Sequence, residues 1–98
     1  MSLSDDLTRA LLQLADDIKL ATASAYNPTE FRRMVASSGG LPTAKGLIAR
    51  SPSDGYLRLA ELQRTDLTLE AFILKNPKFW PLFSETELAM CRKRAPDA

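Results

Sequence analysis

The chain has 98 residues, of which 45% are hydrophobic and 26% are charged, and its formal net charge is +1. This length suits one domain with a single core, and the near-neutral charge argues against a dedicated nucleic-acid binder. The chain contains no histidine and a single cysteine, which excludes an internal disulfide and the commonest zinc ligand and general base. No run approaches the ~18 apolar residues of a membrane span. We expect a cytoplasmic protein with no metal, no cofactor and no membrane association.

The first predicted element is a long amphipathic helix over residues 4–24, opened by Ser4 and by acidic residues in its first turn. Its apolar residues recur at alternating spacings of four and three, which is typical of a helix that pairs with another helix. These candidate self-association residues are Leu7, Leu11, Leu14 and Ile18, and Ala21 continues the stripe. Two interpretations stay open: the helix lies on its own core, or it pairs with a second copy or a partner protein.

Three short helices are predicted in the middle of the chain, with boundaries set by proline and glycine. The second helix starts at Asn27-Pro28 and stops before the glycine pair at 39–40. The third covers residues 44–50 and ends at Ser51-Pro52, and the fourth runs over residues 54–63.

The fifth predicted helix, capped by Asp66 and ended by Asn76-Pro77, is apolar on almost every side and is therefore expected to be buried. Glu70 lies among its apolar residues, so its carboxylate should be paired with an arginine, and Arg58 or Arg64 is the expected partner. A catalytic pair of Asp66 and Glu70 is the alternative. Because no metal-ligand cluster or glycine-rich loop accompanies these carboxylates, we predict no enzyme.

The end of the chain contains an aromatic segment and a last helix. Residues 77–81 are expected to form a turn or 3₁₀ turn, in which Phe79 and Trp80 belong either to the core or to an interface. The last helix, residues 85–94, follows a capping box formed by Ser84 and Glu87. Cys91 lies beside basic residues that could lower its thiol pKa, but no partner base is evident, and a half-buried structural cysteine is the preferred interpretation.

Together these elements predict an all-α fold, a compact bundle of five or six short helices with a longer amphipathic N-terminal helix. No segment alternates with the period of a strand. We expect one domain over residues 1–98, in which residues 27–95 form the helical core.

A sequence pattern covers much of the second half of the chain. It reads S-D-G-Y from Ser53, R-L-x-E-L from Arg58, D-L-T-L-E from Asp66, and L-F-x-x-x-E-L-x-x-x-R from Leu82, with Ala60 at the x position where the pattern usually has Trp. The pattern resembles a small bacterial family of all-helical proteins to which no activity is assigned. The resemblance extends over residues 39–94 and implies a helical fold and a bacterial or phage origin, but it implies no activity.

The sequence therefore favours a small helical protein-interaction module that forms a homodimer or binds a partner protein through its N-terminal helix. The alternative is an accessory or regulatory protein that binds DNA, with Arg50, Arg58 and Arg64 on phosphates. This alternative is less favoured because Asp54 and Glu61 share the fourth helix with Arg58.

Overall fold

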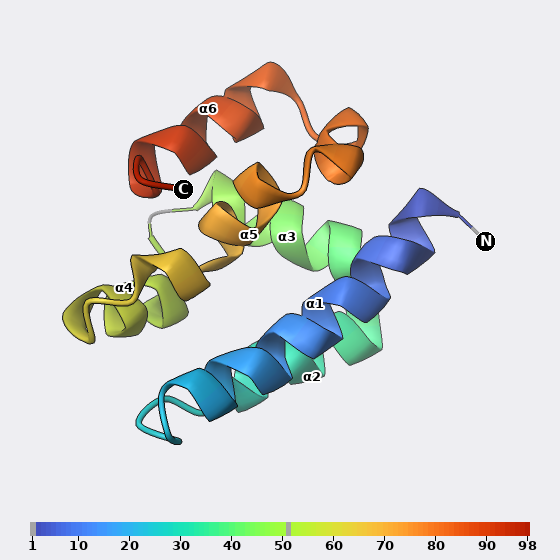
Figure 1. Cartoon of the computed structure of the whole chain (residues 1–98). Helices are drawn as coiled ribbons and strands as arrows, with labels where there is room; N and C mark the ends of the chain where they lie inside the picture. The colour runs from blue at the N-terminus through green and yellow to red at the C-terminus, as the bar shows by residue number, and fades with distance from the viewer. Residues whose placement is uncertain (1, 51) are drawn as a thin grey trace. The chain divides into compact units, whose positions relative to one another are not determined.

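A computed structural model of the chain describes residues 2–50 and 52–98, and all regular elements among them are helices (Figure 1). The α-helices are α1 Leu3–Ala21, α2 Thr29–Ser38, α3 Gly40–Ala49, α4 Asp54–Glu61, α5 Leu69–Lys75 and α6 Glu85–Arg94, and the 3₁₀ helices are η1 Thr65–Leu67 and η2 Pro77–Leu82. The predicted all-α class is confirmed, as is the longer N-terminal helix, which has 19 residues. Ser51, predicted to end the third helix, lies outside the described residues.

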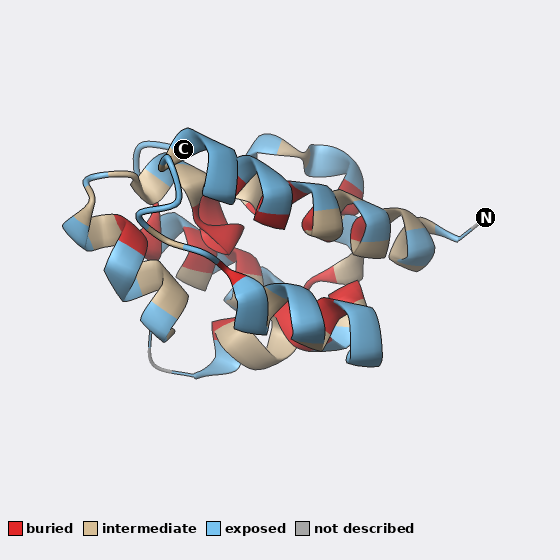
Figure 2. Ribbon diagram, turned by 90° about the horizontal axis from the view of Figure 1, so that it is seen from below, coloured by how far each residue is buried: buried red, intermediate tan, exposed pale blue. Residues whose placement is uncertain are grey.

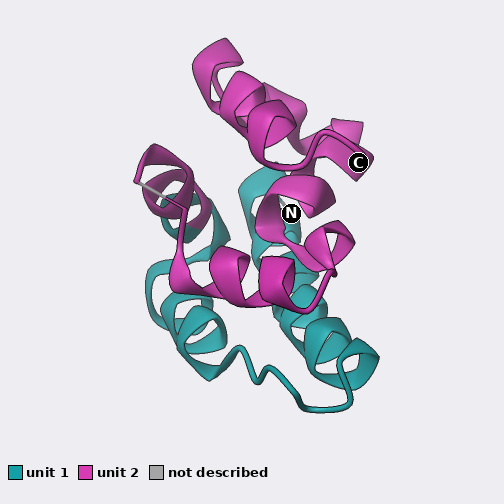
Figure 3. Ribbon diagram, turned by 90° about the vertical axis from the view of Figure 1, so that its left-hand side faces the viewer, with its two compact units in different colours: residues 1–43 teal, residues 44–98 magenta. Residues whose placement is uncertain are grey.

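The chain divides into two compact units, Met1–Thr43 and Ala44–Ala98, which we call unit 1 and unit 2 (Figure 3). The boundary between them falls inside α3. The single domain expected from the sequence stays a prediction.

In unit 1, α1 packs against α2. The buried residues of α1 recur along one side of the helix, as the red bands in Figure 2 show. They are Leu7, Leu11, Leu14, Ala15 and Ile18. On the outer edge of the pair, Arg32 of α2 donates hydrogen bonds to the Leu12 carbonyl oxygen at 3.2 Å and to the Asp16 carboxylate at 2.6 Å. The periodicity thus marks a buried helix face, and an exposed ion pair borders it.

Both ends of α1 differ from the prediction. The helix begins at Leu3, one residue earlier than Ser4, because the hydroxyl of the N-cap residue Ser2 accepts a hydrogen bond from the Asp5 amide at 3.0 Å. It ends at Ala21 rather than at residue 24, because Ala23 and Ser24 have φ angles of 50° and 65°, in the left-handed region. Side-chain capping and backbone conformation, rather than hydrophobic periodicity, set these ends.

The predicted stop at two glycines is wrong for the second glycine. Only Gly39 interrupts the helices, with a φ of 93°, whereas α3 already begins at Gly40 and carries Pro42 in its first turn. The Gly40 amide donates a hydrogen bond to the Thr8 hydroxyl at 2.8 Å, which supplies a partner for one of the free amides at the start of α3. The third helix therefore starts four residues earlier than residue 44.

The other helix starts follow local capping. The Ser53 hydroxyl accepts from the Tyr56 amide at 3.1 Å at the start of α4. In α2 the predicted cap at Asn27 is wrong, because Pro28 occupies the N-cap position and no side chain bonds there. The predicted capping box of α6 is confirmed: the Glu87 amide donates to the Ser84 hydroxyl, and the Ser84 amide donates to the Glu87 carboxylate.

The core of unit 2 is centred on α5, as its apolar composition predicted. Four of its seven residues are buried, including Ile73 and Glu70. The helix is capped by Thr68, whose hydroxyl accepts from the Ala71 amide at 3.2 Å, so the predicted cap by Asp66 is wrong. Asp66 instead lies in η1, because Thr68 has the extended backbone conformation of an N-cap residue and separates η1 from α5.

Candidate functional site

The four candidate self-association residues of α1 are buried. Leu7 and Leu11 are 0% exposed, and Leu14 and Ile18 are less than a tenth exposed. Their side chains therefore lie in the interior of the chain. A dimer that used them would first have to expose them at the cost of their burial.

The apolar side chains that do face solvent lie elsewhere. Among the described large hydrophobic residues, Leu20 is 79% exposed and Leu57 of α4 is 49% exposed. Leu20 lies two residues after Ile18, which places it on the polar side of α1. The sequence signal for this surface is a leucine outside the apolar stripe of α1, which helical periodicity alone does not mark.

Leu20 belongs to a segment that we call the α1–α2 tip, residues 20–26. Its alanines are exposed, and Tyr26 is half-buried. The Thr22 hydroxyl donates to the Ile18 carbonyl oxygen at 2.8 Å and accepts from the Tyr26 amide at 3.4 Å. These bonds fold the tip back on the end of α1. The tip is therefore an apolar surface with a defined backbone.

In unit 2 the structure brings together a buried ion pair. The Arg94 guanidinium of α6 donates a hydrogen bond to the Glu70 carboxylate of α5 at 3.1 Å, and the two side chains are only 7% and 4% exposed. Arg94 also donates to the carbonyl oxygens of Leu47, at 3.4 Å, and Arg50, at the end of α3. The backbone carbonyl oxygen of Arg94 accepts from the Tyr56 hydroxyl of α4 at 2.5 Å. One residue thus links α6 to three other helices.

The prediction that Glu70 is paired with an arginine is confirmed, but the predicted partners are wrong. Arg58 pairs with Glu61 at 3.1 Å, one turn along the same helix. Arg64 donates two hydrogen bonds of 3.0 Å to Asp66, and this lowers the pKa of the Asp66 carboxyl. Both arginines are therefore paired with carboxylates that lie close to them in the chain.

The two carboxylates considered as a catalytic pair have separate surroundings. Asp66 is exposed in η1 with Arg64, whereas Glu70 is buried in α5 with Arg94. Each carboxylate has its own arginine, so neither is arranged as a general acid or base beside the other.

The three arginines considered for nucleic-acid binding have different surroundings. Arg50 is exposed, and its carbonyl oxygen accepts a hydrogen bond from Arg94. Arg58 and Arg64 each have a carboxylate partner, as described above. A phosphate would have to compete with those carboxylates for both guanidinium groups.

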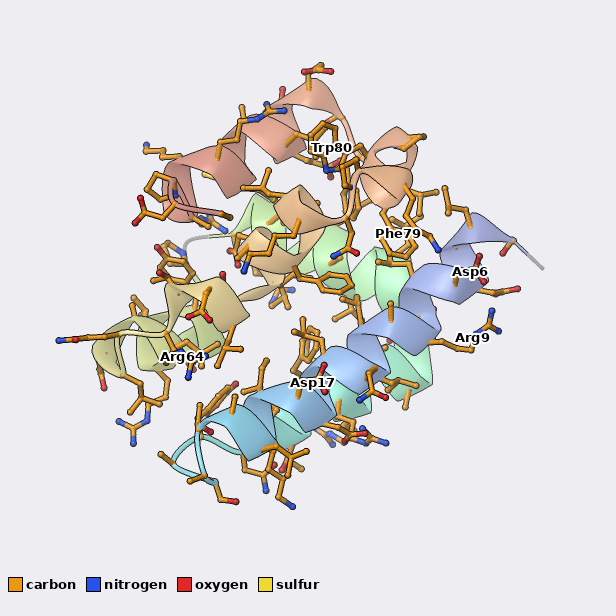
Figure 4. The ribbon with its side chains drawn as sticks, in the orientation of Figure 1. Asp6, Arg9, Asp17, Arg64, Phe79 and Trp80 are labelled. Atoms are coloured by element: carbon orange, nitrogen blue, oxygen red, sulfur yellow. The ribbon has the colours of Figure 1, made fainter. Side chains whose placement is uncertain are left out.

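Phe79 and Trp80 of η2 differ in exposure, and Figure 4 shows Trp80 beside α6. Phe79 is 2% exposed and stacks on Phe72, with ring centroids 6.2 Å apart, so it belongs to the core. Trp80 is half-buried; its indole N–H donates to the Ile73 carbonyl oxygen at 2.8 Å, and the Arg92 guanidinium lies 5.7 Å from its ring centroid. Both aromatic side chains therefore make contacts with other residues of unit 2.

Cys91 is completely buried in α6, which corrects the expectation of a half-buried residue. Burial, together with the nearby Glu70 carboxylate, raises the pKa of the thiol to about 11, opposite to the lowering that the basic neighbours suggested. Because the thiolate is the nucleophilic form, this cysteine is unreactive in the folded chain.

A small hollow of about 80 Å³ lies at the surface of unit 2. It is lined by Thr65, Asp66, Ala71, Ala95, Asp97 and Ala98. Within residues 2–50 and 52–98, no group of three or more histidine, cysteine or acidic side chains is arranged to hold a metal ion. In the same part of the chain, every helix is too short or too polar to cross a membrane.

No protein-family model, curated protein or solved structure matches this chain. The resemblance of residues 39–94 to a bacterial family of helical proteins stays a prediction.

Proposed function

We propose that this chain is a helical protein-interaction module that self-associates through the α1–α2 tip. The observation that carries the proposal is the exposure of Leu20, of which 79% faces solvent at the end of an otherwise amphipathic helix. Covering an exposed leucine contributes roughly 1.5–3 kcal/mol of favourable transfer free energy, and two copies of the tip would cover two such side chains.

The tip has two further properties that suit an interface. Its neighbouring exposed residues, Ala21, Ala23 and Ala25, are small and apolar, so a second copy can approach the backbone closely. Ala23 and Ser24 both hold left-handed backbone conformations, which cost free energy in residues other than glycine. Strain of this kind is concentrated at binding and switching segments of proteins.

The proposal keeps the N-terminal helix as the association element but moves the contact to its C-terminal end. The buried stripe that includes Leu11 and Ile18 serves as core in this account. A charge introduced at either position would unfold the chain, and loss of a dimer in such a variant would therefore say nothing about an interface.

Under this proposal the chain performs no catalysis and needs no cofactor. The buried Glu70 and the exposed Asp66 serve as ion-pair partners of arginines. The buried Cys91 serves as a core residue.

The test is the solution mass of the wild-type chain and of two variants, by light scattering during size exclusion over a range of protein concentrations. The Leu20→Asp variant removes the proposed contact. Leu57→Asp is the matched control, because Leu57 is the other exposed large hydrophobic residue described and belongs to α4. We expect dimers for the wild type and for Leu57→Asp, and a folded monomer for Leu20→Asp. A monomeric wild type at the highest concentration, or a dimer that survives Leu20→Asp, would refute the proposal.

The alternative of DNA binding through Arg50, Arg58 and Arg64 has less support, because two of the three guanidinium groups have carboxylate partners. It predicts binding to duplex DNA that weakens steeply as salt increases. Reversal of all three charges should abolish that binding.

A further inference from the structure

Arg94 donates hydrogen bonds to carbonyl groups at the end of α3. The last four carbonyl groups of a helix have no partner inside it; the Leu47 carbonyl is one of these groups in α3, and the Arg50 carbonyl directly follows the helix. Both accept hydrogen bonds from the Arg94 guanidinium. The last turn of α6 therefore supplies two hydrogen bonds to the end of α3.

The first turn of α6 has separate anchors. The capping box of Ser84 and Glu87 fixes the start of the helix, and Lys45 of α3 donates to the Glu87 carboxylate at 2.7 Å. Leu88 is buried one residue later. None of these contacts involves Arg94, so all of them would remain if the last turn of α6 detached.

A buried ion pair contributes little net free energy to holding two helices together. Removing two charges from water costs about as much free energy as their attraction in the protein returns. The pair itself therefore adds little to the free energy needed to open unit 2 at this point.

We propose that the last turn of α6 is a latch, formed by Arg94 on Glu70 and on the α3 carbonyl groups, that opens and closes without unfolding the rest of unit 2. In the open state the turn that contains Arg94 leaves α5, and the end of α3 loses its cap. The Tyr56 hydroxyl of α4 loses its acceptor at the same time. The latch thus couples the end of α6 to the ends of α3 and α4.

The reactivity of the Cys91 thiol can be used to measure this motion. It lies one helical turn before Arg94, it is 0% exposed, and it is the only cysteine of the chain. Opening of the latch brings its thiol to solvent, where the thiol regains an ordinary pKa and reacts with an aromatic disulfide reagent. The rate of that reaction therefore measures how often the latch opens.

The experiment measures the labelling rate of Cys91 in the whole chain from zero to denaturing urea concentrations, beside global unfolding followed by circular dichroism. Opening of the latch alone exposes little surface, so its rate is almost independent of urea, whereas global unfolding depends steeply on urea. Arg94→Met removes the latch. Lys93→Met is the matched control, since it removes one positive charge from the same turn at an exposed position.

We expect the wild type at low urea to label through the urea-independent route. Arg94→Met should accelerate that route about 100-fold or more, because it leaves Glu70 buried without a partner. Lys93→Met should change it by no more than about 2-fold. If Arg94→Met does not fold, Glu70→Gln provides the same test, because it removes the charge of the pair and keeps the shape of the side chain.

Two results would overturn the latch. One is labelling of the wild type and of the latch variant only through the urea-dependent route, with a free energy equal to that of global unfolding. The other is equal acceleration by Arg94→Met and Lys93→Met.

Discussion

In unit 1 every buried side chain of α1 is apolar, whereas unit 2 buries a glutamate and an arginine among its apolar residues. The apolar face of α1 is built from residues three and four positions apart within one helix. The ion pair of unit 2 joins residues that are 24 positions apart, and the bonds of Arg94 to α3 span 44 and 47 positions. Contacts of the first kind can be recognised in a sequence, and contacts of the second kind cannot.

The largest single effect should come from Arg94 in unit 2. Arg94→Met removes the partner of Glu70 and should lower the free energy of unfolding by about 3–5 kcal/mol, because a buried charge is then left uncompensated. Urea unfolding followed by circular dichroism measures the change. Lys93→Met, exposed on the same turn, should stay within about 0.5 kcal/mol of the wild type. Equal losses in the two variants would mean that the pair has no special role.

In unit 1 the corresponding test is a purely apolar one. Leu11 is 0% exposed, and Leu11→Ala should cost about 2–5 kcal/mol, since it removes buried methyl groups and leaves a cavity. Leu20→Ala on the same helix should change stability by less than about 0.5 kcal/mol, because Leu20 is 79% exposed. Similar losses at both positions would contradict the division of α1 into a buried and an exposed side.

The two glycines of α3 should respond in opposite directions. A Cβ atom at Gly40 would lie 2.7 Å from the Thr8 Cα atom, so Gly40→Ala should destabilise the chain by about 1–3 kcal/mol. A Cβ atom at Gly46 would meet no other atom within 4 Å, and Gly46→Ala should stabilise the same helix by about 0.5–1 kcal/mol. Thermal unfolding of both variants checks the signs. Stabilisation by Gly40→Ala would show that α1 and the start of α3 are farther apart than described.

The smallest effect should be the pH dependence that Glu87 contributes. Burial alone would raise the pKa of its carboxyl, but hydrogen bonds from Lys45 and Ser84 outweigh it and hold that pKa below the ordinary value of 4.5. The stabilisation is therefore present above pH 4.5 and is lost as the pH falls through the lowered pKa. Glu87→Gln keeps an acceptor for the Ser84 amide and removes the charge, so it should cost about 0.5–1 kcal/mol at neutral pH.

The difference between wild type and Glu87→Gln should shrink toward zero in acid, as measured by urea unfolding at a series of pH values. A difference that stays constant with pH would mean that Glu87 stabilises the chain through the hydrogen bonds of the capping box and not through the attraction between its charge and Lys45.

The sequence predicted the parts of the fold that depend on local rules. The heptad-like stripe of α1, the capping box at Ser84 and the 3₁₀ segment after Pro77 were all recognised, because each involves residues within a few positions of one another. The buried position of α5 was predicted from its composition, and the need of Glu70 for a partner followed from its apolar neighbours.

The sequence could not predict which partner Glu70 has. Arg58 and Arg64 were nearer in the chain, but Glu61 and Asp66 lie nearer still to each of them and form ion pairs with them. The start of α3 was missed for a related reason. Gly40 is helical because its amide bonds to Thr8, which lies 32 positions earlier. In both cases a residue distant in the sequence decides between local alternatives.

The most direct test of the contrast between the two units is the stability of the double variant Glu70→Met/Arg94→Met beside its two single variants. Each single variant should lose about 3–5 kcal/mol, because each leaves one buried charge without its partner. The account predicts that the double variant recovers most of this loss, since two apolar side chains of similar length then fill the same space. A double variant as unstable as the sum of the two single variants would contradict the account, because the two side chains would then contribute independently.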